Sequence, residues 1–109
     1  MEVFEMTKAY PKEERYSLTD QIRRSSRSVC ANTAEAWRKR RYRAAFVAKL
    51  SDVETEACET QVWLEMSAKC KYITTEIKTS LSDRYEKLIA QIVTMIDGAD
   101  KWVIKLNRK

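Results

Sequence analysis

The sequence predicts an all-α fold, an up-and-down four-helix bundle with a short first helix. The 109 residues include one glycine and one proline, too few for the many turns of a sheet protein. Apolar residues make up 44% of the chain and charged residues 34%, a mixture typical of helices with one buried stripe. Because this length suits one hydrophobic core, we expect residues 1–109 to form a single domain.

The first two helices are predicted from the proline and from the apolar spacing. A short helix over residues 2–9 ends before Pro11, because the residue preceding a proline disfavours helical geometry. Ser17 is then a suitable N-cap. The second helix runs from about Leu18 to beyond Trp37, with apolar and small residues at steps of three and four. We expect this helix to be central, since small side chains let a neighbouring backbone approach closely.

The third helix is predicted over about residues 44–70 and has two apolar faces. One face packs within the bundle. The other, around Trp63 and Met66, predicts a contact with a second copy of the chain. A broad intramolecular core around Trp63 is an equally good interpretation. An acidic edge on the same side as Trp63 would meet a basic edge of the neighbour and consists of Asp52, Glu56 and Glu59.

The fourth helix follows a turn at residues 72–73 and is capped by Thr74 or Thr75. Its apolar stripe, from Ile77 to Leu106, is the longest regular pattern in the chain. Gly98 interrupts this pattern at a cost of about 1 kcal/mol relative to alanine, so it marks either a bend or an early end of the helix.

Basic residues are concentrated in one part of the sequence. Residues 21–50 hold nine basic side chains and one acidic one, whereas residues 51–66 hold five acidic side chains and no basic one. The run 38–43 has five cations in six positions, although a helix C-terminus needs only one or two to complement its dipole. Trp37 and Tyr42 bracket this run, and aromatic rings can stack on exposed bases.

The run therefore predicts a patch that binds nucleic acid, with RNA favoured. Arginine suits phosphate because its planar fork donates two hydrogen bonds at once. The cations expected to carry binding are Arg38, Lys39, Arg40, Arg41 and Arg43. Three arginines on the outer side of the second helix widen the patch, although an ordinary solvated face explains them equally well: Arg23, Arg24 and Arg27.

The composition argues against catalysis and against a metal or cofactor site. Histidine, the usual proton shuttle near neutral pH, is absent, so Ser/His and Cys/His pairs cannot form. One glycine excludes a glycine-rich phosphate loop. The acidic trio Asp52, Glu56 and Glu59 shares a helical face, but acids on a solvated face are far commoner than cation sites. We therefore expect a protein that is not an enzyme and that holds no metal or cofactor.

The cysteines and the N-terminus indicate a cytoplasmic protein. Cys30, Cys58 and Cys70 form no CxxC pair, and we expect them to be buried, inert thiols in a reducing compartment. Residues 1–10 lack the basic start and apolar centre of a signal peptide. No apolar run approaches the roughly 20 residues that span a bilayer, so we expect no membrane contact.

A specific run of residues begins at Pro11 and reads PKEERYSLTDQIRR, followed by Ser-Val at 28–29 and Asn-Thr-Ala-Glu at 32–35. With these residues, the stretch from Tyr10 to about Tyr72 resembles the four-helix bundle family of 23S rRNA intervening-sequence proteins, which are bacterial. The resemblance implies a bundle that assembles as a ring-like homopentamer. The chain is also similar to the accessory bundle of diversity-generating retroelements, a basic pentamer that binds nucleic acid and a reverse transcriptase. The family's molecular function is poorly defined, so no established site is carried over.

The chain departs from the family pattern in two places. Thr33 and Ala36 stand where the family usually has isoleucine and glycine, which leaves the end of the second helix open to change. The family's first helix is longer than the ten residues before Pro11, so a groove of the bundle is expected to be uncovered. Asn32 matches the pattern, and we expect it to hydrogen-bond a backbone group in a turn; a binding role is the less favoured interpretation.

Two functional hypotheses follow from these features. The first is an accessory protein that binds nucleic acid, RNA favoured, through the basic patch. The alternative is a protein-interaction scaffold or accessory subunit, for example for a reverse transcriptase, that binds its protein partner through the second apolar face near Trp63.

Overall fold

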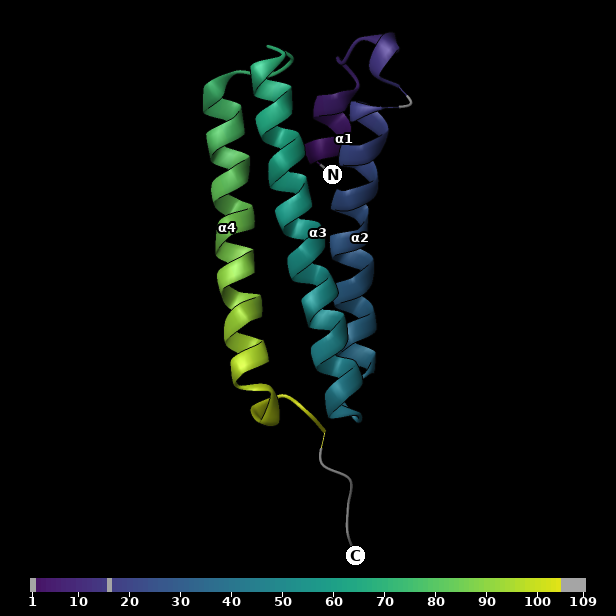
Figure 1. Cartoon of the computed structure of the whole chain (residues 1–109), viewed down its shortest axis with the longest axis vertical. Coiled ribbons are helices and arrows are strands. Elements are labelled where there is room, and N and C mark those ends of the chain that lie inside the picture. The colour runs from purple at the N-terminus through teal and green to yellow at the C-terminus, as the bar shows by residue number, and fades with distance from the viewer. Residues whose placement is uncertain (1, 16, 105–109) are drawn as a thin grey trace, which may run out of the picture.

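A computed structural model describes residues 2–15 and 17–104 of the chain (Figure 1). These residues form four α-helices and no strand, which confirms the predicted all-α class. The three long helices run alternately down and up and are joined by short turns (Figure 1). The helices are α1 (Glu2–Thr7), α2 (Leu18–Arg38), α3 (Arg43–Lys69) and α4 (Thr75–Asp97), and the 3-10 turns are η1 (Lys12–Glu14) and η2 (Ala99–Lys101).

Helix α3 is the centre of the bundle. Both α2 and α4 pack along it, and the short α1 packs on α2 near one end (Figure 1). The prediction that the second helix is central was wrong, because the small side chains of α2 bring it close to α3 and not between two long helices. Since α1 covers only one end of the space between α2 and α4, the bundle is incomplete at one corner.

Two hydrophobic clusters form the core along α3. The first lies near the α2–α3 turn and contains Phe46, Leu50 and Val53 of α3 with Ile92 of α4. Each such side chain stabilises the fold by about 1.5–3 kcal/mol when it is fully buried. The second cluster lies toward the opposite end and draws on all four helices, with Val3, Ile22, Leu64 and Leu81.

A buried polar contact joins α2 to α3. Ser25 and Thr60 are both fully buried, and the Thr60 hydroxyl donates to Oγ of Ser25 at 2.8 Å. Both side chains are small, so the two helices approach closely at this point. Thr33 of α2 is exposed, and its hydroxyl donates to the carbonyl of Val29 at 2.6 Å.

The two predicted helix caps differ in outcome. Thr74 caps α4 as predicted, because its side chain accepts a hydrogen bond from the amide of Ile77 at 3.1 Å. The expectation that the Ser17 side chain caps α2 was wrong. Its hydroxyl donates to Glu14 at 2.5 Å, and the same carboxylate accepts from the amide of Leu18 at 3.4 Å. A charged carboxylate is the stronger acceptor, so it takes the role expected of the hydroxyl.

Helix α4 ends early, at Asp97, and not at the end of its apolar stripe. The amide of Gly98 still bonds to the carbonyl of Thr94 at 3.0 Å, after which the chain tightens into η2. The chain then turns back toward the α2–α3 turn, where the amide of Ile104 donates to the carbonyl of Arg40 at 2.8 Å. Of the two interpretations of Gly98, the early end is therefore confirmed; Leu106 lies outside the described residues.

The three cysteines are exposed and not paired with one another, so the expectation of buried thiols was wrong. Cys30 lines a cavity between α2 and α4, and Cys58 lies on α3 near Glu86 of α4, where partial burial raises the pKa of its thiol. In the part of the chain that the structure describes, no helix is long and apolar enough to cross a membrane.

Candidate functional site

The basic run occupies the last residue of α2, a four-residue turn and the first residue of α3. Helix α2 ends where the amide of Lys39 bonds to the carbonyls of Glu35 and Ala36, and the amide of Tyr42 then closes the turn on the carbonyl of Lys39 at 2.9 Å. Because the turn is so short, its side chains spread around one end of the bundle. We call residues 37–43 the basic end.

The cations of the basic end differ in how far they are engaged. Arg38 and Arg41 are exposed and make no hydrogen bond or ion pair with any described residue. Lys39 is exposed near Glu35. The pKa of Glu35 is held below its usual value mainly by a hydrogen bond from Lys49, with a lesser contribution from the charge of Lys39. These three cations are therefore the ones available to a ligand.

Arg40 is held against the ring of Trp37. Its guanidinium carbon lies 3.5 Å from the centre of that ring, and its Nε donates to the carbonyl of Trp37 at 3.0 Å. A cation stacked on an aromatic face is stabilised by the ring quadrupole. Arg40 thus fixes the orientation of Trp37, which remains 50% exposed, while Tyr42 is 65% exposed.

The C-terminal segment completes this surface (Figure 1). Nε of Arg43 donates to Asp100 of η2 at 2.7 Å, so Arg43 already has an acidic partner within the chain. The ring of Trp102 meets that of Trp37 edge-on, with the ring centres 6.4 Å apart, and Trp102 is 40% exposed. Sequence reasoning missed Trp102, although an aromatic residue in a basic tail was a signal that could have pointed to it.

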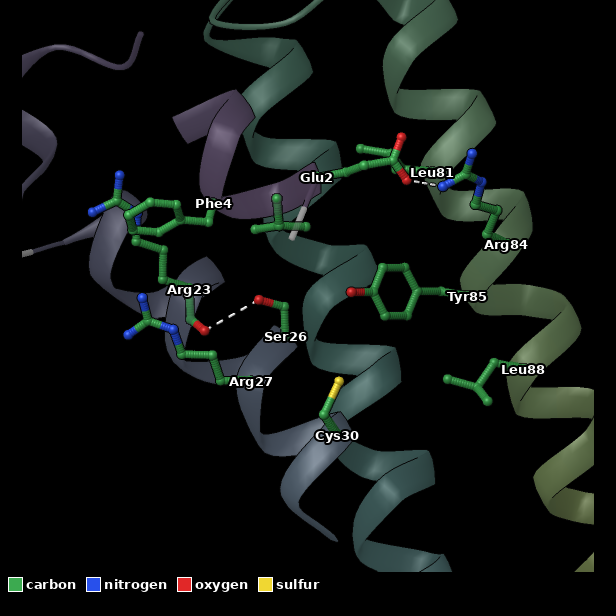
Figure 2. Close-up of a pocket in the computed structure, with 11 residues that line it drawn as sticks. Glu2, Phe4, Arg23, Ser26, Arg27, Cys30, Leu81, Arg84, Tyr85 and Leu88 are labelled. Atoms are coloured by element: carbon green, nitrogen blue, oxygen red, sulfur yellow. Dashed lines mark hydrogen bonds and ion pairs between the residues drawn. The ribbon is translucent and has the colours of Figure 1, made fainter. Parts of the chain in front are cut away.

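The three outer arginines of α2 are separate from the basic end. Arg38 is eleven positions after Arg27 in the same helix, which separates the two backbones by about 16 Å. Nε of Arg23 donates to the hydroxyl of Thr7 at 2.7 Å. The guanidinium carbons of Arg23 and Arg27 lie 4.5 and 5.5 Å from the centre of the Phe4 ring (Figure 2). The eight predicted cations therefore form two separate groups. In the group on α2, Arg23 and Arg27 hold α1, whereas Arg24 pairs with acids of α3.

A cavity of about 340 Å³ lies beside these arginines, between α2 and α4 (Figure 2). It lies beside the first residues of α1, Glu2 to Phe4, which agrees with the groove expected from a short first helix. The hydroxyl of Tyr85 and the sulfur of Cys30 face one another across it (Figure 2). Its apolar wall comes from α4, with Leu81 and Leu88.

The acidic edge of α3 has partners within the chain. Arg24 donates to Glu59 at 2.5 Å and to Glu56 at 3.3 Å, so these groups are not free to meet a neighbouring copy as expected. The indole N–H of Trp63 also donates to Glu59, at 3.2 Å. Burial raises the pKa of Glu59, but the hydrogen bonds from Arg24 and Trp63 outweigh burial and hold that pKa below its usual value.

The second apolar face of α3 is divided. Trp63 is half-buried against the second hydrophobic cluster, as the intramolecular interpretation required. Met66 is 46% exposed and Val62 54% exposed, so these two side chains remain on the surface. Among the described residues, no three His, Cys, Asp or Glu side chains lie close enough together to hold a metal ion.

Lys49 of α3 contacts three polar side chains of α2 and α3. Its Nζ lies 2.7 Å from Glu35 and 3.8 Å from Asp52. It also donates to the side-chain oxygen of Asn32 at 3.4 Å. The expectation that Asn32 bonds a backbone group in a turn was therefore wrong, because Asn32 lies in mid-helix, where the backbone groups are already paired.

Comparisons with known proteins agree with this architecture. The family model described as 23S rRNA-intervening sequence protein matches residues 1–94. A crystal structure of a protein with unknown function from the S23 ribosomal protein family of Bacteroides thetaiotaomicron is similar over 87% of this chain and 85% of that chain, with 28% sequence identity and a TM-score of 0.76. No curated protein matches the sequence. Because the family match spans most of its length, the chain belongs to the family of 23S rRNA-intervening sequence proteins.

Proposed function

We propose that this chain is a non-catalytic protein that binds nucleic acid, RNA favoured, through its basic end. The observation that carries the proposal is the pair of exposed guanidinium groups, Arg38 and Arg41, which have no partner among the described residues and stand beside exposed aromatic rings. A guanidinium without a carboxylate partner is free to donate two hydrogen bonds to a phosphate. The family description, which refers to 23S rRNA, supports RNA as the nucleic acid.

Binding would proceed by neutralising phosphates. Arg38, Lys39 and Arg41 would each replace a condensed counterion on the RNA, which makes the affinity fall steeply with salt. The first turn of α3 contains no acidic residue, and the side chain of Tyr42 does not cap it. Its free amide groups add a partial positive charge to the same surface. Arg40 and Arg43 contribute charge too, but their first role is to hold Trp37 and the C-terminal segment.

We also propose that the chain acts as a homo-oligomer, with a ring of five copies as the family resemblance implies. The exposed Val62 and Met66 on α3 support a contact between copies, since adjacent apolar side chains on a surface favour association. In a ring the basic end would be repeated, and several weak sites would act together on one RNA. Light scattering after gel filtration tests this step, and a particle of 12.8 kDa at micromolar concentration would contradict it.

Fluorescence anisotropy of a structured RNA, at low and at moderate salt, tests the proposed binding. The key variant changes Arg38, Lys39 and Arg41 to glutamine and leaves Arg40 and Arg43 in place, so that the surface keeps its shape. We expect tight, salt-sensitive binding by the wild type and a loss of at least tenfold in the variant at low salt.

A matched control removes the same charge elsewhere. Lys12, Lys69 and Lys87 are exposed and distant from the basic end, so changing them to glutamine lowers the net charge equally. We expect this control to bind RNA almost as well as the wild type. If the two variants lose the same RNA affinity, binding depends on the net charge of the protein and not on the basic end. If the wild type does not bind RNA at low salt, the proposed function is refuted.

A protein-interaction scaffold is the second candidate, favoured by the same exposed pair, Val62 and Met66. In this case the partner would be a protein, such as a reverse transcriptase. A pull-down that recovers one protein partner after nuclease treatment, and loses it when Val62 and Met66 are changed to serine, would support this alternative.

A further inference from the structure

We infer that the basic end selects RNA with unpaired nucleotides over continuous duplex, and that Tyr42 is the ring on which an unpaired base stacks. This inference rests on the proposed function and names the form of RNA that the same site takes. It follows from three observations on the basic end: which rings are exposed, which ring has a free face, and how few cations are free.

Three large rings are exposed at one end of the bundle. Tyr42 is 65% exposed, Trp37 50% and Trp102 40%, and all three lie within or against the basic end. A site that only neutralises phosphates gains nothing from such rings. In a continuous duplex the faces of the bases are covered by their neighbours, so only an unpaired base can offer a face to an aromatic ring.

The three rings are not equivalent. Trp37 carries the guanidinium of Arg40 on its face and the ring of Trp102 against it, so the two indoles brace one another. Tyr42 has no ring or cation partner among the described residues, and its phenol group makes no hydrogen bond with them. It is therefore the ring whose face is available, and its position in a short, hydrogen-bonded turn holds its backbone in place.

The number of free cations favours the same conclusion. Within residues 37–43, the cations available for phosphates are Arg38, Lys39 and Arg41, because Arg40 lies against Trp37 and Arg43 is paired with Asp100. Proteins that recognise double-stranded RNA by shape spread their contacts over many phosphates, across about 16 base pairs. Three cations at the narrow end of a helical bundle cannot span that length. Stacking beside a few phosphate contacts is the mode of binding that suits single-stranded RNA.

The test compares two RNA probes of the same number of nucleotides and nearly the same charge, by fluorescence anisotropy at low salt. One is an unstructured single strand of 20 nucleotides, and the other is a blunt duplex of 10 base pairs. The full chain is used as wild type, Tyr42→Ala and Tyr42→Phe, with circular dichroism to confirm that the helical content is unchanged. The phenylalanine variant keeps the ring and serves as the matched control.

We expect the wild type to bind the single strand at least fivefold more tightly than the duplex. Loss of one stacked base weakens binding by roughly 5- to 150-fold, so Tyr42→Ala should lose that much affinity for the single strand and little for the duplex. Tyr42→Phe should retain the wild-type affinity.

Each other outcome has a definite meaning. If the wild type binds both probes equally, or if Tyr42→Ala binds the single strand as the wild type does, the inference is wrong while the proposed function stands. If the alanine and phenylalanine variants lose affinity equally, the hydroxyl and not the ring is responsible, and stacking is refuted. If the wild type binds neither probe at low salt, the proposed function itself fails.

Discussion

Replacing Asp100 by asparagine should strengthen RNA binding. Asp100 is the acidic partner of Arg43, and the 2.7 Å contact between them is exposed on both sides. Exposed ion pairs contribute only about 0–1 kcal/mol to stability, so Asp100→Asn should leave the fold intact. The substitution frees Arg43, at the first position of α3, to contact a phosphate, and it removes the negative charge that repels that phosphate.

The size of the gain follows from counterion release. Each phosphate contact on a single strand changes the slope of log affinity against log salt by about −0.7. At 0.1 M salt, one additional contact therefore raises affinity about fivefold over the 1 M reference, and the slope becomes steeper by about 0.7. Anisotropy titrations with the single-stranded probe at four salt concentrations measure both quantities.

Asp83→Asn is the matched control for this prediction, because Asp83 is an exposed acid in the middle of α4 and the substitution changes the net charge equally. If the two variants gain the same affinity, only the overall charge matters, and the role given to Arg43 is wrong. A loss of affinity in Asp100→Asn would show that the carboxylate positions Arg43 for binding and does not withhold it.

Three further predictions concern the fold. Phe46 is completely buried, so Phe46→Ala should lower the free energy of unfolding by about 3–5 kcal/mol in a urea titration; a loss below about 1 kcal/mol would mean that the cluster closes around the space. Ser25→Ala and Thr60→Val should each cost about 1 kcal/mol, and the double variant should cost less than their sum, because both single variants lose the same Thr60–Ser25 hydrogen bond. Strict additivity would argue against the contact. The hydroxyl of Tyr72 donates to Glu14 at 2.7 Å, which helps to lower the pKa of Glu14 and raises that of Tyr72 to about 12. The contact should therefore stabilise the fold between about pH 4.5 and pH 10, and its contribution should weaken as the pH falls below 4.5 or rises from 10 toward 12. The urea midpoint of Tyr72→Phe should lie below that of the wild type at intermediate pH, and the two midpoints should converge at both extremes of pH. A difference that stays constant with pH would contradict the coupling.

The helices were predictable because their burial is periodic. The spacing of apolar residues gave the bounds of α2 and α3 to within about two residues, since each helix must present one stripe to the core. The capping of α2 was not predictable in the same way. Ser17 has the right chemistry, but Glu14 also accepts a hydrogen bond from Tyr72, which lies 58 residues away. The hydrogen bond from Tyr72 to Glu14 is a tertiary contact, so the local sequence pattern does not predict it.

The candidate site was predictable in its location and not in its composition. The charge of residues 38–43 is visible in the sequence, but the partners that engage Arg40 and Arg43 depend on how the chain folds. Arg43 and Asp100 are 57 residues apart and meet only because α4 stops at Gly98 and the chain turns back. The sequence left that stop as one of two possibilities, so Trp102 could not be assigned to the site.

Counting cations along the sequence therefore overstates the strength of one binding site. Of the eight predicted cations, Arg24 and Arg43 are held in ion pairs, while Arg23 and Arg40 donate hydrogen bonds within the chain and lie over aromatic rings. Three free cations at 0.15 M salt give an electrostatic gain of only about 50-fold over the 1 M reference. One stacked base adds roughly 5- to 150-fold. If the affinity at 1 M salt is on the order of 1 M⁻¹, a single copy would bind a single strand with a dissociation constant of about 0.1–4 mM.

That weakness links the two parts of the proposed function. If RNA binding at physiological salt is micromolar or tighter, one basic end cannot account for it, and several copies must contact the same RNA. In that case, a variant that cannot associate should lose far more RNA affinity than a substitution within one basic end does. Changing Val62 and Met66 to serine, on the opposite side of α3 from the core, tests this directly. If this variant is monomeric by light scattering and still binds RNA at micromolar concentration in 0.15 M salt, additional groups must contact the RNA, and the arginines beside α1 are the next to examine.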